Sequence, residues 1–174
     1  KAFGYDQKTN QKVFSKVDLE HFVDDISERM DSAEVSSEDM NLLKNALDFS
    51  NVKARDCMIP RTEIIAVDID DSLDTVMQLF IAKGLSKVII CRDSIDNIIG
   101  YVHSYDLFKS PQSIKQILLP IHFVPSVTTG EELLSKFTEQ SGNIAIVSDE
   151  YGGTAGMVTL EDVIEEIFGE IEDE

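Results

Sequence analysis

A short motif that occurs twice places the strongest constraint on how this chain can fold. Residues 156–162 read Gly-Met-Val-Thr-Leu-Glu-Asp, and residues 100–106 read Gly-Tyr-Val-His-Ser-Tyr-Asp. In each copy an apolar segment of strand type leads into a capping position, with an aspartate three residues later, so each copy predicts a strand that runs directly into a helix. The two aspartates lie 56 residues apart. A repeat of this length predicts two copies of one supersecondary unit.

Both copies predict the same order of elements, namely strand, helix, strand, strand and helix. In the first copy these elements fall at residues 64–67, 72–83, 88–91, 98–102 and 106–108, with the apolar face of the first helix at Val76, Met77, Leu79 and Phe80. In the second copy they fall at 123–124, 129–137, 144–147, 155–158 and from 161 onward. Residues 117–120 mirror 57–60, where Met58 to Arg61 read as an exposed turn. The prediction is an α/β (α+β) fold of two pseudo-symmetric units packed through their sheets.

The residues before the first copy carry two helical patterns. Apolar residues from Val17 to Met30 mark one face of an amphipathic helix, and a second helix is predicted from Ser36 onward through Leu42 and Leu47. We therefore predict a helical linker at residues 1–50, one repeat at 51–111, a second at 112–170 and an acidic tail at 171–174. Because the chain begins with Lys1, we expect it to be a piece of a longer protein.

Charge and cysteine content exclude several classes of function. The formal net charge of −18 disfavours nucleic acid and anionic lipid, both of which attract Lys and Arg. No apolar run in these residues reaches the roughly 18 residues that cross a bilayer, and none of them shows the pattern of a signal peptide. Cys57 and Cys91 lie in apolar segments far apart, which is typical of reduced cysteines in a cytosolic protein.

The sequence contains no metal constellation or catalytic group that we recognise, so we predict a module without enzymatic activity. Asp68 opens an acidic stretch, but Leu73 and Leu79 occupy the glycine and glutamate positions of a calcium-binding EF-hand loop. The glycines at 152, 153 and 156 lead into a strand and lack the ending of a phosphate-binding loop, so a hairpin turn is predicted there. The acidic tail is interpreted as a solvated end, with a loose magnesium site as the alternative.

Three longer segments resemble a known family. They are residues 57–63 (Cys-Met-Ile-Pro-Arg-Thr-Glu), 150–156 (Glu-Tyr-Gly-Gly-Thr-Ala-Gly) and 161–166 (Glu-Asp-Val-Ile-Glu-Glu). Together with the repeated motif, they make residues 52–170 similar to the tandem CBS-domain pair (Bateman module) of the CorC, haemolysin C and cyclin-M magnesium/cobalt transport family. The resemblance implies a regulatory module on the cytoplasmic side of the cell membrane that binds an adenosine nucleotide. It also implies a homodimer formed through the CBS modules, and a membrane-spanning domain in the same parent chain.

The resemblance also implies where a nucleotide would bind. In the family the aspartate of the motif holds the ribose hydroxyls and the threonine contacts ribose or phosphate, which points to Asp162 and Thr159. The residues alone favour a simple capping box, and the repeat together with the resemblance favours the nucleotide site; both uses are compatible because a carboxylate has about four lone-pair sites. In the first copy His103 replaces the threonine, so the pocket of Asp106 is the poorer candidate. We expect one occupied site, built around Asp162.

The remaining candidate residues would hold the base and the phosphates. Ile65, Leu85 and Met157 are candidates for an apolar adenine slot, with core packing as the alternative for each. Lys87 matches the family position of a phosphate-binding cation, and Ser86 beside it offers a hydroxyl; a solvated surface lysine is the alternative. The expected ligand is AMP, ADP or ATP, the last with or without magnesium. The rival hypothesis is a structural dimerisation and docking module whose pockets are empty.

Overall fold

The computed structural model describes residues 37–139 and 142–169, and the chain divides into two compact units at residues 1–48 and 49–174. The described part of the first unit is helix α2 (Ser37–Asp48), which confirms the helix predicted from Ser36. The predicted helix between Val17 and Met30 and the acidic tail lie outside the described residues. Within the described ranges, no helix has the length and apolar content to cross a membrane.

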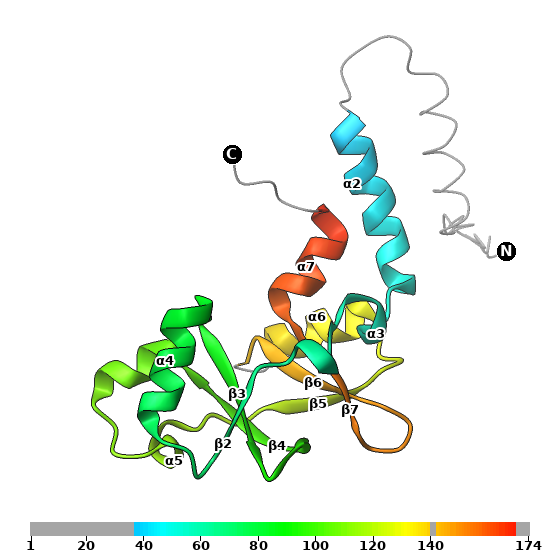
Figure 1. The fold of residues 1–174 in the computed structure, drawn as a ribbon. Helices are drawn as coiled ribbons and strands as arrows, with labels where there is room; N and C mark the ends of the chain where they lie inside the picture. Colours follow the sequence, from blue (N-terminus) through cyan, green and yellow to red (C-terminus); the bar gives the residue numbers. More distant parts are fainter. Residues whose placement is uncertain (1–36, 140–141, 170–174) are drawn as a thin grey trace, which may run out of the picture. The chain divides into compact units, whose positions relative to one another are not determined.

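The second unit contains two sheets, one for each repeat (Figure 1). The first repeat comprises β2 (Ala66–Asp68), α4 (Leu73–Lys83), β3 (Lys87–Arg92), β4 (Ser94–His103) and η3 (Ser104–Lys109). The second comprises β5 (His122–Pro125), α6 (Gly130–Glu139), β6 (Ile144–Ser148), β7 (Thr154–Thr159) and α7 (Leu160–Phe168). In each repeat the first strand is parallel to the second and the second is antiparallel to the third.

Short connecting elements precede each repeat. Before the first lie η1 (Phe49–Asn51), α3 (Ala54–Cys57), β1 (Ile59–Pro60) and η2 (Arg61–Glu63); before the second lies α5 (Ile114–Ile117).

The caps of the longer helices follow the predicted chemistry. The Ser72 hydroxyl accepts a hydrogen bond from the Thr75 amide, and α4 ends at Gly84, whose φ of 65° is left-handed. Thr129 and Glu132 form a reciprocal capping box at the start of α6.

The two sheets pack face to face, and helices cover their outer faces. Alternate residues of β3 point to opposite sides, so Ile89 and Cys91 contact the other sheet while Val88 and Ile90 pack under α4. The same alternation occurs in β6, where Ile144 and Ile146 join the inter-sheet core; Ala145 and Val147 pack in the core that includes residues of α6 and α7. Burial on both faces explains why both strands are continuous apolar runs. The predicted pair of units packed through their sheets is confirmed.

Each repeat also lends its leading segment to the sheet of the other. β1 pairs antiparallel with β7, which gives the second sheet the order β1-β7-β6-β5. In the same way Leu119, before β5, forms a bridge with Tyr101 in β4. The expectation that Met58 to Arg61 form an exposed turn is therefore wrong. The two-residue strand was not recognisable because its partner lies almost 100 residues further along the chain.

Three local predictions need correction. The first strand covers Ala66–Asp68 and not residues 64–67, because only these three residues pair with β3. The returning strand begins at Ser94 and not at residue 98, because a tight turn at Asp93, whose φ is 64°, reverses the chain at once. Met77 is exposed, whereas Leu73 packs against the core beneath α4.

Candidate functional site

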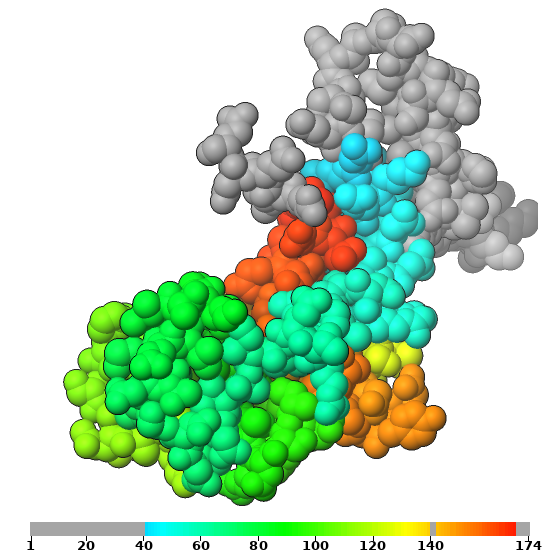
Figure 2. Space-filling model, viewed as in Figure 1, coloured from blue at the N-terminus to red at the C-terminus, as the bar shows by residue number. Residues whose placement is uncertain are grey.

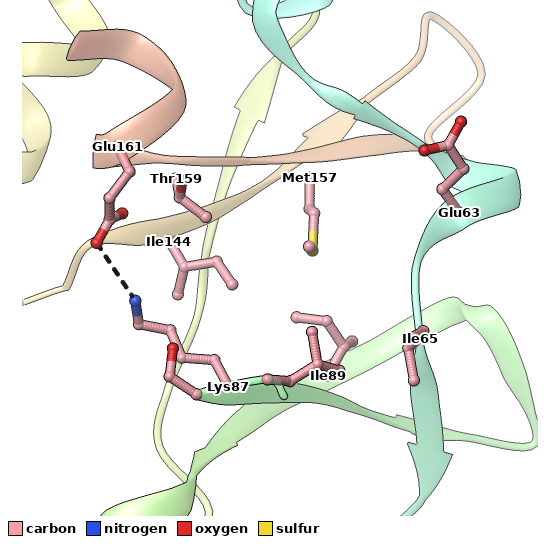
Figure 3. A pocket seen from close by; sticks show the side chains of 10 residues that line it. Glu63, Ile65, Lys87, Ile89, Ile144, Met157, Thr159 and Glu161 are labelled. Atoms are coloured by element: carbon pink, nitrogen blue, oxygen red, sulfur yellow. Dashed lines mark ion pairs between the residues drawn. The ribbon is translucent and has the colours of Figure 1, made fainter. Parts of the chain in front are cut away.

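A cavity of about 300 Å³ opens between the two repeats (Figure 3). Its lining combines an apolar middle with polar ends, and the residues are Glu63, Ile65, Leu85, Ser86, Lys87, Ile89, Ile144, Met157, Thr159 and Glu161. In Figure 3 Lys87 and Glu161 lie on one side of the cavity and Glu63 and Ile65 on the other. The lining therefore offers apolar side chains to a ring in the middle of the cavity and one cation, Lys87, to a negatively charged group at one side.

The fold brings six of the eight predicted site residues to this cavity, namely Ile65, Leu85, Ser86, Lys87, Met157 and Thr159. Lys87 opens β3 in the first sheet, while Thr159 closes β7 in the second and pairs with Ile144. Because the sheets face each other, residues of both strands reach the same space. The two predicted aspartates, Asp162 and Asp106, are not among the residues that line the cavity.

Four lining residues were not predicted, and three of them had a signal in the sequence. Ile89 lies two residues after Lys87, on the same face of β3. Glu63 lies two residues before Ile65, and Glu161 lies immediately before Asp162 in the repeated motif. Ile144 could be assigned only from the register of β6 against β7.

Asp162 and Thr159 form the capping box at the start of α7. One carboxylate oxygen of Asp162, Oδ2, accepts hydrogen bonds from the Thr159 amide and hydroxyl, both at 2.7 Å. The Asp162 amide in turn donates to the Thr159 hydroxyl at 3.3 Å. In the described part of the chain the other carboxylate oxygen, Oδ1, accepts no hydrogen bond. The carboxylate is therefore held in place while one oxygen retains its capacity to accept a hydrogen bond.

The equivalent aspartate of the first repeat has a different environment. Asp106 is buried, and its Oδ1 atom accepts a hydrogen bond from Lys109 Nζ at 2.6 Å. His103 caps η3 through its ring, since Nδ1 accepts from the Tyr105 amide at 3.1 Å. Burial, with the nearby Asp106 carboxylate as a second cause, raises the pKa of Tyr101. Asp106 is thus bound within its own helix, and the choice of Asp162 as the centre of the site stays a prediction.

Lys87 is the one cation among the residues that line the cavity. Its side chain is 19% exposed, and Nζ lies 3.8 Å from Glu161 Oε1. Glu63 adds a second carboxylate to the lining. The described residues contain no group of three or more His, Cys, Asp or Glu side chains that could hold a metal ion.

The glycine-rich segment forms the predicted hairpin between β6 and β7. The Asp149 amide donates to the Gly153 carbonyl at 2.9 Å, and Gly152 takes a φ of 82°. Asp149 Oδ1 accepts from the amides of Tyr151 and Gly153 at 2.9 and 2.8 Å. Because a carboxylate already occupies these amides, they do not form a phosphate-binding loop.

The base of this hairpin is tied to the first repeat by a latch of three residues, Arg61, Asp96 and Thr154. The Arg61 guanidinium makes a bidentate ion pair with Asp96, in which Nη2 lies 2.7 Å from Oδ2. Asp96 Oδ1 also accepts from the Thr154 amide at 3.0 Å, and the Thr154 carbonyl accepts from Arg61 at 3.3 Å. In Figure 2 the green hairpin between β3 and β4 lies beside the orange hairpin between β6 and β7. Arg61 therefore joins the repeats and does not line the cavity.

The two cysteines are free thiols, as predicted. Cys57 is half-buried and Cys91 is buried. Burial, followed by the charges of Glu166 and Asp162, raises the pKa of Cys57 to about 11. At neutral pH this thiol stays protonated, which is the state of an unreactive structural cysteine.

Two β-α-β-β-α units that face each other across a ligand-sized cavity define a class of proteins built from a tandem pair of small α/β modules. The CBS-domain family model matches residues 54–113 and 114–169. The chain belongs to the CBS-domain family, and its tandem pair is of the kind present in the CNNM/CorC and haemolysin C proteins. The predicted family and fold are thereby confirmed.

Curated relatives and solved structures carry related names. The chain is 35% identical to the UPF0053 protein YugS of Bacillus subtilis over all of its own length and 41% of the relative. It is 30% identical to the magnesium and cobalt efflux protein CorC of Vibrio cholerae over 90% of its own length and 56% of the relative. The chain therefore spans about half of the length of these proteins.

Among solved structures, the CBS domain of a bacterial CNNM/CorC family Mg²⁺ transporter has a TM-score of 0.83 and 31% identity, covering 91% of this chain and 99% of that one. The same kind of domain in complex with ATP has a TM-score of 0.72 and 35% identity, with 75% and 97% covered. A CBS-domain pair with bound AMP from Klebsiella pneumoniae has a TM-score of 0.59 and 31% identity, with 68% and 99% covered.

Proposed function

We propose that this chain is the regulatory CBS-pair module of a magnesium or cobalt transport protein, and that it binds an adenosine nucleotide in the cavity between the repeats. The observation that carries the proposal is the lining of that cavity, an apolar slot with Lys87, Ser86 and Thr159 among its polar residues. The ATP-bound and AMP-bound neighbours support the choice of ligand. The parent chain would place this module on the cytoplasmic side of the cell membrane, beside a membrane-spanning domain.

The parts of a nucleotide match the parts of the cavity. Adenine would lie against Ile65, Leu85 and Met157, since aromatic rings bind in apolar slots. The ribose hydroxyls would donate to Asp162 Oδ1 beside Thr159, and the phosphates would reach Lys87 and Ser86. Such a ligand would regulate the parent transporter only if its affinity differs between two conformations of the module. Because residues of both repeats line the cavity, a change in how the repeats pack would change its affinity for a ligand.

A thermal-shift experiment with AMP, ADP and ATP tests the proposal. A ligand at about 100 times its dissociation constant should stabilise the protein by roughly 2.7 kcal/mol. Asp162→Ala should abolish the ligand-induced shift and also lower the baseline stability by about 0.5–2 kcal/mol, because it removes a helix cap. Glu132→Ala is the matched control: it breaks the corresponding capping box of α6, outside the cavity lining, and should retain the full ligand-induced shift.

Two results would contradict the proposal. If no adenine nucleotide shifts the melting temperature of the unmodified protein, the rival hypothesis of an empty structural docking module is favoured. If Asp162→Ala and Glu132→Ala keep equal ligand-induced shifts, the Asp162 carboxylate does not hold the ligand. Incubation with ATP should release no product, since we propose a module without catalytic activity.

Dimerisation is the second part of the proposed function, and an exposed apolar patch favours it. The patch consists of Met77 and Ile81 on α4 together with Tyr105 and Phe108 on η3, and the two helices contact each other. Ile81 is 78% exposed and Phe108 is 84% exposed, while the rings of Tyr105 and Phe108 lie 6.2 Å apart. Clustered apolar side chains of this size are typical of a surface that a partner covers. We propose a second copy of this chain as that partner.

A further inference from the structure

One wall of the cavity is formed by a segment that crosses from one sheet to the other. β1 pairs with β7 in the second sheet, whereas β2 pairs with β3 in the first, so residues 61–65 link the two sheets. This wall segment carries Glu63 and Ile65, which line the cavity (Figure 3). Its residues lie between β1 and β2 and belong to neither strand, so strand pairing alone does not determine where this wall stands.

The latch fastens the first residue of the wall segment to both repeats. The Arg61 guanidinium makes a bidentate ion pair with Asp96 of the first repeat, and it donates to the Thr154 carbonyl of the second at 3.3 Å. Asp96 Oδ1 accepts from the Thr154 amide at 3.0 Å. The hydroxyl of the buried Thr154 donates to the Ile95 carbonyl at 2.9 Å. The wall segment is therefore attached where the two repeats are also attached to each other.

The geometry of the latch makes it stronger than an ordinary surface ion pair. The side chains of Arg61 and Asp96 are 40% and 46% exposed, but two parallel contacts and the bonds to Thr154 fix the direction of the guanidinium. The ion pair of Asp70 and Lys115 offers a comparison, because its side chains are 72% and 62% exposed and it has a single contact of 2.9 Å. Opening the latch should thus cost more than opening this second pair.

We infer that Arg61 and Asp96 are positioning residues of the nucleotide site, which hold the wall segment where Ile65 can contact the base of the ligand. This inference rests on the proposed nucleotide site. Neither residue lines the cavity, so both would act through the wall segment and not by touching the ligand. The apparent affinity falls with the fraction of molecules in which the binding-competent arrangement is formed. Because AMP and ATP share the same base, opening the latch should weaken both by the same factor.

Isothermal titration calorimetry of the full chain, well below its melting temperature, tests the inference. Asp96→Asn and Arg61→Gln should each bind AMP and ATP about fivefold more weakly than the unmodified protein, with equal factors for the two nucleotides. The double variant should lose no more than either single variant, because both substitutions break the same ion pair.

Two control variants separate the position of the wall from general stability. Asp70→Asn removes the same charge from an ion pair outside the latch and the cavity lining. Ser72→Ala removes the N-cap of α4 and should lower the melting temperature. Both controls should keep the unmodified affinities. Hydrogen exchange without nucleotide adds a second readout, since the amides of the wall segment should exchange faster in Asp96→Asn than in the unmodified protein or in Ser72→Ala.

The other outcomes distinguish this inference from the proposed function. Unchanged affinities in Asp96→Asn and Arg61→Gln would overturn the inference and leave the nucleotide site standing. A larger loss for ATP than for AMP in Arg61→Gln would also overturn it, since Arg61 would then hold the phosphates itself. An equal loss of affinity in Ser72→Ala would overturn it as well, because general stability would then explain the effect. Absence of nucleotide binding by the unmodified protein would overturn both proposals.

Discussion

At the scale of single residues, the glycines of the repeated motif are required by a contact between the repeats. A Cβ atom on Gly156 would lie 2.5 Å from the Ile59 carbonyl oxygen and 2.7 Å from Met58 Sδ. A Cβ atom on Gly100 would collide with the Leu119 carbonyl oxygen in the same way. Gly156 thus allows β1 to lie close beside β7, and Gly100 allows the segment at Leu119 to lie close beside β4. Their role is steric, and it is the same in both copies.

The first prediction concerns this contact. Gly156→Ala should destabilise the protein by about 1–3 kcal/mol, because a backbone oxygen must move to admit the methyl group. Gly142→Ala is the control, since a methyl group at that position would meet the His122 ring at 3.8 Å, which is an ordinary contact. Urea denaturation measures both free energies of unfolding. Equal free energies of unfolding for the two variants would show that the contact between β1 and β7 is not tight.

At the scale of secondary-structure elements, the latch connects the β3–β4 hairpin, the β6–β7 hairpin and η2. The hydrogen bond from Arg61 and then the bond from the Thr154 amide lower the pKa of Asp96. The segment that follows Arg61 carries Glu63 and Ile65, which form one wall of the cavity. The ion pair therefore connects the packing of the two repeats to the position of that wall.

The second prediction follows from the direction of this pKa shift. Because the folded state has the lower pKa, the ionised Asp96 stabilises the protein above the unfolded value of about 3.9, and this contribution disappears as the pH falls through the folded pKa. Asp96→Asn should therefore lower the melting temperature at pH 7, and the gap to the unmodified protein should close in acid. Asp70→Asn, which removes the exposed pair with Lys115, is the control and should have a smaller effect at pH 7. A difference in melting temperature that does not change with pH would contradict a lowered pKa of Asp96 in the folded state.

At the scale of the whole molecule, the net charge of −18 acts on any anionic ligand. A triphosphate approaching this protein is repelled, and the one lysine in the cavity lining offsets only part of that repulsion. The exposed patch on α4 and η3 is apolar and in contact with water, so the hydrophobic effect would favour covering it. Ligand binding therefore depends on electrostatic interactions, whereas assembly depends on burial of apolar surface.

The third prediction is that magnesium strengthens ATP binding markedly and changes AMP binding little. Magnesium reduces the charge of the triphosphate, whereas the monophosphate carries too little charge to benefit as much. Calorimetry with and without the ion, at constant ionic strength, measures the two ratios. An ATP affinity that is equal in both conditions would contradict the prediction.

The fourth prediction concerns assembly through the exposed apolar patch. Ile81→Asp places a charge in the middle of the proposed interface, so it should shift a dimer to monomers. Multi-angle light scattering over a range of concentrations measures the mass. Lys83→Asp provides a charge change on the same helix outside the patch and should leave the mass unchanged. A monomeric unmodified protein at high concentration would rule out the proposed dimer.

The repeat, the apolar strand segments, the helical spacing of apolar residues and the capping boxes were readable from the sequence because each is a local pattern. They were sufficient to predict the two-unit fold, the hairpin at Gly152 and Gly153, and, with the family resemblance, six residues of the cavity lining. Local patterns could not locate β1, whose two residues become a strand only beside β7. Nor could they locate the turn at Asp93, where a non-glycine residue takes a left-handed conformation.

By itself, the sequence determined that this protein consists of two similar units built around continuous apolar strands, since hydrophobic periodicity and helix caps act between near neighbours. Only the tertiary structure decided that the units exchange their leading segments, that Asp96 closes a latch, and that Glu161 meets Lys87 across the cavity. These contacts join residues 35 to about 100 positions apart. Their geometry depends on how two complete sheets pack, which no short segment of the chain encodes.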